Sequence, residues 1–345
     1  MGRICAHLSP KPPMRPVIKE ADVVRQIEES TRTGAQANAG QRLTLGIGDD
    51  AALWKPRSGF ETILTTDWFL EGTHFWRDWH PPEAVGWKCV MRAASDIAAM
   101  GGAPSCLLLS LALPPAFAGG WLGKFLMGLN WASAKLKCPL VGGDTTRSDQ
   151  ILIHLTVVGE VSRGKALLRS GAKPGDLIYV TGRLGEAELG LRLAREYRRR
   201  GRRAEGKLLL KHLYPEARIA LAGWLGKTRL ASGAMDLSDG LSLDLQRLCV
   251  ASGVGAILQT DCIPLAGREF TARFPSSERI KAALNGGDDY ELLFCVNPES
   301  HHRIPANKFG VKLTQIGEIT KKHGITIVGA AGQAKELLPQ GWEPF

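Results

Sequence analysis

A turn-forming segment near the middle of the chain, SGAKPGD (residues 170–176), divides the sequence into two series of predicted strands and helices. Gly and Pro at this density end regular secondary structure. In the first series, apolar periodicity predicts helices over 19–30, 83–100 and 117–136, strands over 43–47, 61–66, 105–113 and 150–160, and a buried strand that ends at Val141. The second series begins with a strand at 176–182 and includes a helix over 239–252 and strands over 255–259, 290–296, 311–317 and 324–328. This mixed order predicts an α+β fold rather than a parallel Rossmann sheet.

The length of the chain agrees with two domains, because 345 residues exceed the usual size of one. Residues 1–18 contain Pro, Lys and Arg without apolar periodicity, and we expect them to form a flexible arm. The N-terminal domain is then expected to span residues 19–162, and the C-terminal domain residues 163–345.

The composition is that of an ordinary globular protein, with 44% hydrophobic and 23% charged residues. Its seven cysteines are scattered without a C-x-x-C pair, which indicates free thiols in a reducing compartment. The longest apolar stretch, LLLSLALPPAFA (residues 107–118), is broken by two prolines, and the N-terminus lacks a continuous apolar segment. Neither export nor membrane insertion is therefore indicated, and we expect a cytoplasmic location.

The net charge of +10 raises the question of a nucleic-acid partner. The segment RLAREYRRRGRR (residues 192–203) contains seven Arg and one Glu, so it accounts for +6 of that charge. One Tyr is nearby, but the segment has no aromatic platform of the kind that stacks on bases. We interpret it as a solvated helix end or surface loop and expect no nucleic-acid partner.

Acidic residues recur beside Gly, Ser or Thr in five segments: GDD (48–50), TTD (65–67), SD (95–96), GGDTT (142–146) and DLSDG (236–240). Each one alone is explained by a helix cap or a turn. Several such segments at strand ends would bring carboxylates together, where they repel one another unless cations neutralise them. The donors are oxygens without His or Cys, which favours Mg²⁺ completed by substrate phosphates.

Asp96 fits a capping role least well, because it lies inside the helical pattern KCVMRAASDIAAMGG among Ala, Ile and Met. Burying a carboxylate alone is costly, so Asp96 needs a partner. That partner is either a distant Arg or Lys or a metal ion.

Two common nucleotide motifs are incomplete. The segment LGIGDDA has the spacing G-x-G-x-x-A, but Asp49 and Asp50 occupy the position of an approaching pyrophosphate and Pro56 interrupts any following helix. The segment GWLGKT (residues 223–228) resembles the end of a Walker A loop, but Leu221 stands where that loop needs Gly.

Taken in order, eight segments resemble the thiamine-monophosphate kinase family, within the superfamily of aminoimidazole ribonucleotide synthetase and selenophosphate synthetase. They are GIGDDAAL, TTDWFLEGTHF, SDIAAMGG, VGGDTTRSD, LLRSGAKPGD, DLSDGLSLDL, GGDDYELLF and the C-terminal GWEPF. The resemblance covers residues 40–345. It implies a two-domain α+β fold, with a mixed N-terminal sheet that forms a barrel in a homodimer and a C-terminal α/β sandwich.

The resemblance also implies site residues. Magnesium ligands would be Asp50, Thr65, Thr66, Asp67, Asp96, Asp144, Asp236 and Asp239. ATP would contact Gly143, Asp144, Arg169 and Ser238, and thiamine monophosphate would contact His74, Asp288 and Phe345. The chain departs from the family pattern at Ala93, where Asn is common, and at Asp288, where Glu is usual.

The implied reaction is the final step of thiamine diphosphate biosynthesis, in which thiamine monophosphate attacks the γ-phosphorus of ATP directly. The attacking oxygen is already anionic, so no general base and no covalent phospho-enzyme are expected. Two alternatives stay open: another enzyme of the superfamily with a different phosphorylated metabolite, or a non-catalytic protein associated with nucleic acid.

Overall fold

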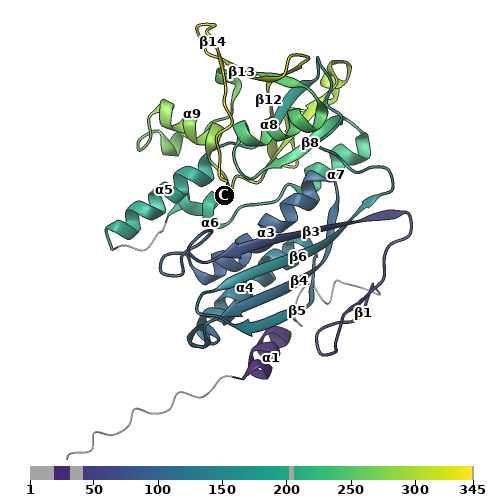
Figure 1. Cartoon of the computed structure of the whole chain (residues 1–345), viewed down its shortest axis with the longest axis vertical. Helices are drawn as coiled ribbons and strands as arrows, with labels where there is room; N and C mark the ends of the chain where they lie inside the picture. Colours follow the sequence, from purple (N-terminus) through teal and green to yellow (C-terminus); the bar gives the residue numbers. More distant parts are fainter. Residues whose placement is uncertain (1–18, 32–41, 202–205, 344–345) are drawn as a thin grey trace, which may run out of the picture.

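The computed structural model describes residues 19–31, 42–201 and 206–343. The first half of the chain forms one sheet with its helices, and the second half forms another that stacks above it along the long axis (Figure 1). The arm expected at residues 1–18 and the C-terminal Phe345 lie outside the described residues. Among the described helices, none combines the length and the hydropathy that a membrane crossing requires.

The first sheet has the strand order β3-β6-β4-β5. Its strands are β3 (Phe60–Leu70), β4 (Ala103–Leu113), β5 (Leu140–Arg147) and β6 (Leu152–Ser162), and a short hairpin of β1 (Leu43–Leu45) and β2 (Leu53–Trp54) precedes them. Strands β4 and β5 are parallel and the other pairs are antiparallel, so the sheet is mixed, as predicted.

One face of this sheet is covered by α3 (Pro82–Ala99) and α4 (Gly120–Leu136), and α1 (Glu20–Thr31) packs against α4 and β5. Two glycines let α3 and α4 approach closely. A Cβ atom on Gly86 would lie 2.0 Å from the carbonyl oxygen of Phe125, and one on Gly128 would lie 1.8 Å from that of Glu83. This close contact fixes α3 against α4, and α3 carries the site residues described below.

The opposite face of the first sheet has no helix on it among the described elements and is partly apolar. Side chains alternate between the two faces of a strand, so β3 turns Leu64 and Trp68 away from α3. Leu64 is 72% exposed and Trp68 is 54% exposed. This open face therefore presents large apolar side chains to solvent.

The second sheet has the order β14-β13-β9-β12-β7-β10-β8, with β11 paired to β12. The strands are β7 (Leu177–Thr181), β8 (Ala231–Leu237), β9 (Gly255–Gln259), β10 (Glu291–Val296), β11 (Asn307–Lys308), β12 (Val311–Thr320), β13 (Gly324–Val328) and β14 (Ala334–Glu336). The helices are α5 (Glu186–Arg199), α6 (Leu210–Leu213), α7 (Ile219–Thr228), α8 (Leu241–Ser252) and α9 (Ser276–Asn285).

Helices cover both faces of this sheet, which is why every residue of β10 is buried. Leu293 and Cys295 join a core with α8 and α9, while Leu292 and Phe294 join a second core with α7. The second core also contains Ala98 from the end of α3. Helix α3 therefore packs against both halves of the molecule.

Two strand predictions are wrong in a way that matters for the site. Strand β5 does not end at Val141 but continues through GGDTT to Arg147, because parallel pairing with β4 supplies its hydrogen bonds. Strand β3 extends to Leu70 beside β6, so Asp67 lies within a strand rather than after it.

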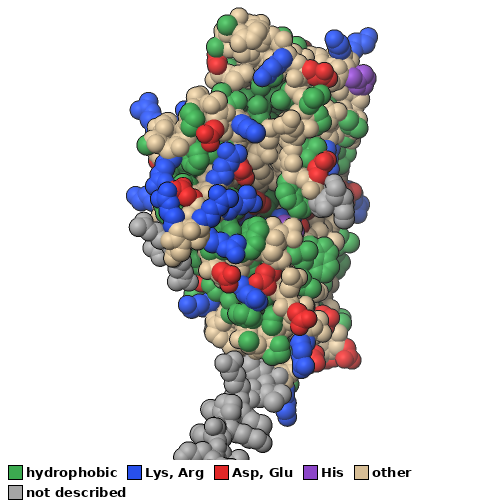
Figure 2. Space-filling model, turned by 60° about the vertical axis from the view of Figure 1, so that its left-hand side comes forward, with side chains coloured by type: hydrophobic (Ala, Val, Ile, Leu, Met, Phe, Trp, Pro, Cys, Tyr) green, Lys and Arg blue, Asp and Glu red, His purple; other side chains and the backbone are tan. Residues whose placement is uncertain are grey.

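The arginine segment begins as a helix: α5 includes it up to Arg199. Lys and Arg side chains gather on the side of the molecule where α5 lies, which faces the viewer in Figure 2.

Candidate functional site

One side of α3 carries four polar residues of the site. Lys88, Arg92, Ser95 and Asp96 are spaced i, i+4, i+7 and i+8, so they lie on one stripe of the helix. Lys88 and Ser95 are buried, and Arg92 and Asp96 are largely so. Because α3 packs against both halves, this stripe faces β3 on one side and the loops of the second sheet on the other.

Asp96 and Asp236 form the first pair of predicted ligands that the fold brings together. Thr65 Oγ1 on β3 donates a hydrogen bond to Asp96 Oδ2 at 2.5 Å, and Ser95 Oγ donates to Asp236 Oδ2 at 2.7 Å. Asp236 stands near the end of β8, in contact with α3. Burial raises the pKa of both carboxyls, and the charge of Asp96 adds to the rise of the Asp236 pKa to about 7. Arg169 opposes this rise in both groups.

Asp67 lies on the same face of β3 as Thr65 and is held by Arg92. The Nε of Arg92 donates to Asp67 Oδ2 at 2.6 Å. Burial raises the pKa of Asp67, Arg92 lowers it, and Asp96 raises it further. The charge of Asp96 therefore also affects the pKa of Asp67.

Ser238 and Asp239 belong to a loop that Asp244 shapes. The backbone N–H groups of Ser238 and Asp239 donate to Asp244 Oδ2 at 3.1 and 3.0 Å. Arg247 Nη1 lies 2.5 Å from Asp239 Oδ2, so this predicted ligand is partly neutralised. The loop therefore projects Asp239 toward Asp96, whose pKa it raises.

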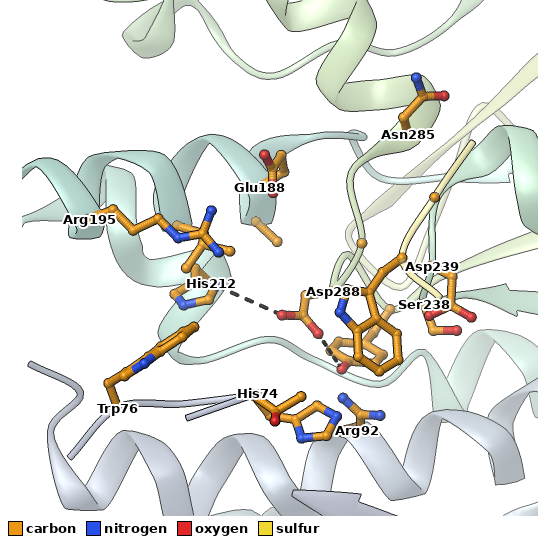
Figure 3. Close-up of a pocket in the computed structure, with 17 residues that line it drawn as sticks. His74, Trp76, Arg92, Glu188, Arg195, His212, Ser238, Asp239, Asn285 and Asp288 are labelled. Carbon is orange, nitrogen blue, oxygen red and sulfur yellow. Dashed lines mark hydrogen bonds and ion pairs between the residues drawn. The ribbon is translucent and has the colours of Figure 1, made fainter. Parts of the chain in front are cut away.

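A cavity of about 290 Å³ opens next to these carboxylates, between the two halves of the chain. Figure 3 shows its walls: His74 and Arg92 come from the first half, and Arg195, His212, Asp288, Ser238 and Asp239 come from the second. Trp76 and Trp342 add aromatic faces to the lining. Of the three residues predicted to contact a substrate, His74 and Asp288 both line this cavity; Phe345 is outside the described residues.

His74 enters the cavity as a neutral base. Its Nδ1 accepts a hydrogen bond from the backbone N–H of Leu70 at 3.0 Å, and its ring centroid lies 5.5 Å from that of Trp342. Burial, and then the charge of Arg92, lower the pKa of His74 to about 4. At neutral pH the imidazole therefore carries no charge.

Asp288 is engaged on both carboxylate oxygens. Oδ2 lies 2.7 Å from the ammonium of Lys88, which is only 2% exposed, and Oδ1 accepts a hydrogen bond from Tyr290 at 2.7 Å. Behind Lys88, His212 and His80 continue the buried polar chain, with Nζ to Nδ1 and Nε2 to Nε2 distances of 3.3 and 3.0 Å. Burial would raise the pKa of Asp288, but Lys88 and the neighbouring cations hold it well below its usual range.

The backbone around Asp288 is strained. Asp288 and Tyr290 have backbone φ angles of 69° and 50°, values that residues other than Gly rarely adopt. The backbone N–H groups of Asp288 and Tyr290 donate to the carbonyls of Ser238 and Leu237, both at 2.8 Å, and these bonds hold the loop in place. Strain of this kind concentrates at functional sites.

Three predicted residues, Asp50, Gly143 and Asp144, lie in a second and larger cavity of about 900 Å³. The GIGDDA loop forms one wall and β5 another. Only Gly fits at position 143, because its φ is 150° and a Cβ atom would lie 1.8 Å from the carbonyl oxygen of Leu109. The GIGDDA loop and the GGDTT segment of β5, both of which carry predicted site residues, therefore line the same cavity.

The predicted ligands nevertheless divide into two groups instead of the single site we expected. Thr66 points to the open face of the sheet, where its hydroxyl contacts His154, whereas Thr65 and Asp67 point to α3. Gly143 is three strands away from Asp67 in register, which is roughly 14 Å at the usual strand spacing. Among the described residues, no three His, Cys, Asp or Glu are gathered tightly enough to enclose a metal ion.

The chemistry of the first group still suits a divalent cation. Asp67, Asp96 and Asp236 supply hard oxygen donors, and their pKa values are raised by burial that internal partners do not fully offset. A bound cation would favour the ionised form of each carboxylate. Oxygen donors of this type match Mg²⁺ better than softer metals.

Lys88, Arg92 and Tyr290 also belong to the site but were not predicted from the sequence. The first two carried a usable signal, because they precede Asp96 by eight and four residues and so share its helix face. Tyr290 had no such signal, since its contact with Asp288 depends on the left-handed backbone of that loop.

Known proteins resemble this chain over most of its length. Residues 48–161 match the family "AIR synthase related protein, N-terminal domain" and residues 173–330 match "AIR synthase related protein, C-terminal domain". The chain is 35% identical to thiamine-monophosphate kinase of Aquifex aeolicus over 301 residues, which cover 87% of this chain and 92% of the relative. It is 37% identical to thiamine-monophosphate kinase of Escherichia coli over 280 residues, covering 80% and 84%.

Solved structures agree with these relatives. Thiamine-monophosphate kinase from Stenotrophomonas maltophilia K279a has a TM-score of 0.78 at 32% identity, covering 91% of this chain and 96% of that one. AaThiL complexed with AMPPCP and TMP has a TM-score of 0.73 at 31% identity, covering 94% and 97%. Hydrogenase Maturation Protein HypE in complex with ATP, at 17% identity and a TM-score of 0.74, shares the fold alone.

Proposed function

This chain belongs to the thiamine-monophosphate kinase family, and we propose that it transfers the γ-phosphoryl group of ATP to thiamine monophosphate, giving thiamine diphosphate and ADP. The observation that carries this proposal is the cavity between the two halves, which has aromatic walls and opens beside buried, incompletely neutralised carboxylates. The solved relative that carries AMPPCP and TMP supports both reactants.

The cavity suits the organic part of thiamine monophosphate. Trp76 and Trp342 present aromatic faces, and a cationic thiazolium on such a face gains roughly 0.5–2 kcal/mol. His74 stays neutral beside it, so the imidazole does not repel the cation. Asp288 forms a wall of the same cavity, but Lys88 neutralises its charge, so we assign it a contact of shape and hydrogen bonding rather than of net charge.

We assign a Mg²⁺ site to Asp67, Asp96, Asp236 and Asp239 with the hydroxyl of Thr65. When bound, Mg²⁺ would neutralise phosphate oxygens and the charge that develops on them during transfer. Thr65 and Ser95 orient Asp96 and Asp236 by the hydrogen bonds described above. Thr66, which faces the other side of the sheet, could join only through its backbone.

The nucleotide is assigned to the second cavity and the segments beside it. Asp50, Gly143 and Asp144 line that cavity, and the missing side chain of Gly143 lets β5 keep its close pairing with β4 there. Arg169 lies close enough to Asp96 and Asp236 to lower their pKa, and Ser238 lines the cavity beside Asp239, so both would meet the far end of the triphosphate.

No residue is assigned the role of a general base. The attacking phosphate oxygen is anionic near neutral pH, so catalysis depends on positioning and charge neutralisation. The neutral His74 is held by the Leu70 backbone through Nδ1, and no carboxylate in the described part of the chain hydrogen-bonds to its ring. The residues of this chain accordingly bind, orient and exclude water.

We also propose that two copies associate through the open face of the first sheet. That face exposes Leu64 and Trp68, and large apolar side chains on one exposed face are typical of an interface. Light scattering on wild type and on Trp68→Glu tests this, since a charge on that face should shift the protein to a monomer.

The reaction is tested by ADP release from MgATP by the purified protein, with and without thiamine monophosphate, and by the mass of the product. Thiamine diphosphate that forms only when both reactants and Mg²⁺ are present supports the proposal. ATP binding without turnover of thiamine monophosphate would refute it and leave another phosphorylated acceptor as the substrate.

A further inference from the structure

Arg92 presents a partly used guanidinium group to the substrate cavity. Its Nε donates to Asp67 Oδ2 at 2.6 Å, while no described residue accepts a hydrogen bond from either of its Nη atoms. The side chain is 20% exposed, and that exposed part lies in the lining of the cavity. Figure 3 shows the guanidinium beside His74 at the wall nearest α3.

The other cations of this cavity are differently placed. Lys88 is buried behind the wall, and its ammonium group is paired with Asp288. Arg195 stands on α5, with its guanidinium carbon 5.9 Å from the centre of the Trp76 ring. Arg92, by contrast, contacts Asp67, one of the carboxylates assigned to Mg²⁺, and also lines the cavity.

A phosphate group next to these carboxylates needs such a cation. Asp67, Asp96 and Asp239 would all repel it, and the fold supplies Asp67 with Arg92 as its partner. Guanidinium is planar and has five N–H donors, so one edge can hold a carboxylate while the other binds two phosphate oxygens. The ammonium group of Lys is a compact point charge and cannot make both contacts.

We propose that Arg92 binds the phosphate of the acceptor, a phosphate monoester, through its Nη atoms, while Asp67 fixes the guanidinium through Nε. The inference rests on the proposed function and adds a residue for the phosphate end of thiamine monophosphate. It also gives Asp67 a second task, because Oδ2 orients Arg92 and Oδ1 stays available for a cation.

The test compares two ligands that differ only by the phosphate. Binding of thiamine and of thiamine monophosphate, without ATP, is followed by calorimetry for wild type, Arg92→Lys and Arg92→Met. Wild type should prefer the monophosphate by about 10–100-fold, the range of a charge-assisted contact. Arg92→Met should lose that preference while its affinity for thiamine changes less than about twofold, and Arg92→Lys should lose most of it.

Two further variants serve as controls. Arg200→Met makes the same chemical change at a surface position paired with Glu196, and it should retain the full preference. Arg195→Met changes the opposite wall of the cavity. A preference that survives in Arg92→Met, or that is lost in Arg195→Met alone, overturns the proposal; so does an equal loss of both ligands in Arg92→Met, which would indicate a distorted cavity.

The two proposals fail separately. If wild type binds neither thiamine compound, the assigned substrate is wrong, and the Arg92 site is then tested with inorganic phosphate. Thermal stabilisation of wild type by phosphate that disappears in Arg92→Met supports the site, and equal or absent stabilisation in both proteins overturns it.

Discussion

Asp288, which lines the cavity with a side chain that is 27% exposed, and the buried Asp236 are both carboxylates of the site, yet the fold compensates them in opposite ways. Asp288 has the ammonium of Lys88 at 2.7 Å and the hydroxyl of Tyr290, and its pKa is held below the usual range. Asp236 has the hydroxyl of Ser95 and the repulsion of Asp96, and burial raises its pKa to about 7. The first carboxylate is satisfied from within the protein, and the second is not.

This difference separates structure from function. Glu291 belongs with Asp288, because Lys211 and Arg218 both pair with it and hold its pKa low although it is fully buried. Burying an unpaired charge costs several kcal/mol, so a fold retains the Asp236 arrangement only where something else supplies the compensation. A cation brought by the substrate or bound beside it meets that requirement.

Lys88→Met gives the strongest test of the compensated side. Removing the ammonium leaves Asp288 as an uncompensated charge, and breaking a buried pair typically costs about 3–5 kcal/mol. Urea unfolding should therefore show a loss of that size relative to wild type. The double variant Lys88→Met/Asp288→Leu removes both charges and should recover part of the loss; a single-variant loss below about 1 kcal/mol would mean that the pair does not stabilise the fold.

Asp96→Asn tests the uncompensated side through turnover. It keeps the size of the side chain and its hydrogen bond from Thr65, but it removes a negative charge from the assigned cation site. We expect kcat to fall by about 10²–10³-fold, the usual loss when one electrostatic contributor is removed. Circular dichroism should stay unchanged, and Asp261→Asn, an exposed surface change, should retain full activity. Normal turnover in Asp96→Asn at limiting Mg²⁺ would remove Asp96 from the ligand set.

Asp236→Asn should stabilise the protein while it inactivates the enzyme. The native pKa of about 7 lies above the unfolded value of 3.8, so the native state binds more protons between these values and its stability falls as the pH rises through them. Asn avoids this loss. Without metal, the variant should gain on wild type from pH 4 to pH 7 and remain ahead above it, by about 1–3 kcal/mol in chemical denaturation. Saturating Mg²⁺ should reverse the order, and a difference that does not depend on pH would contradict the assignment.

Much of the fold follows from local sequence signals. The helical pattern before Gly101 predicts α3 to within one residue at each end, and the mixed order of elements predicts the two-sheet α+β architecture. The lengths of β3 and β5 could not be predicted, because TTD and GGDTT look like turns until β6 and β4 provide strand partners. The tertiary partner, rather than local propensity, decided those ends.

Several of the predicted site residues lie close together, but their arrangement could not be predicted from the sequence. Asp96 and Asp236 meet as expected, because a helix and a strand end carry them to the same place. Asp144 and Thr66 do not join them, because alternation along β3 and the width of the sheet separate residues that the motifs suggest are neighbours. Asp288 was expected to contact the substrate, but its ion pair with Lys88 was not predicted, because that pair depends on packing between α3 and the loop before β10.

The smallest expected effect concerns His74. Burial lowers its pKa and raises that of Asp236, so in both groups it disfavours the charged form. Burial and Arg92 lower the pKa of His74 to about 4, so the ring should gain a proton only as the pH falls through that value. Its NMR signal, assigned by comparison with His74→Gln, should stay constant from pH 8 to pH 5.5, whereas a free imidazole side chain titrates near pH 6.5. A shift between pH 7 and pH 6 would mean that His74 is solvated like a surface residue. In that case the cavity would hold water at this wall, and the desolvation that raises the pKa of Asp236 would not extend to the substrate side of the site.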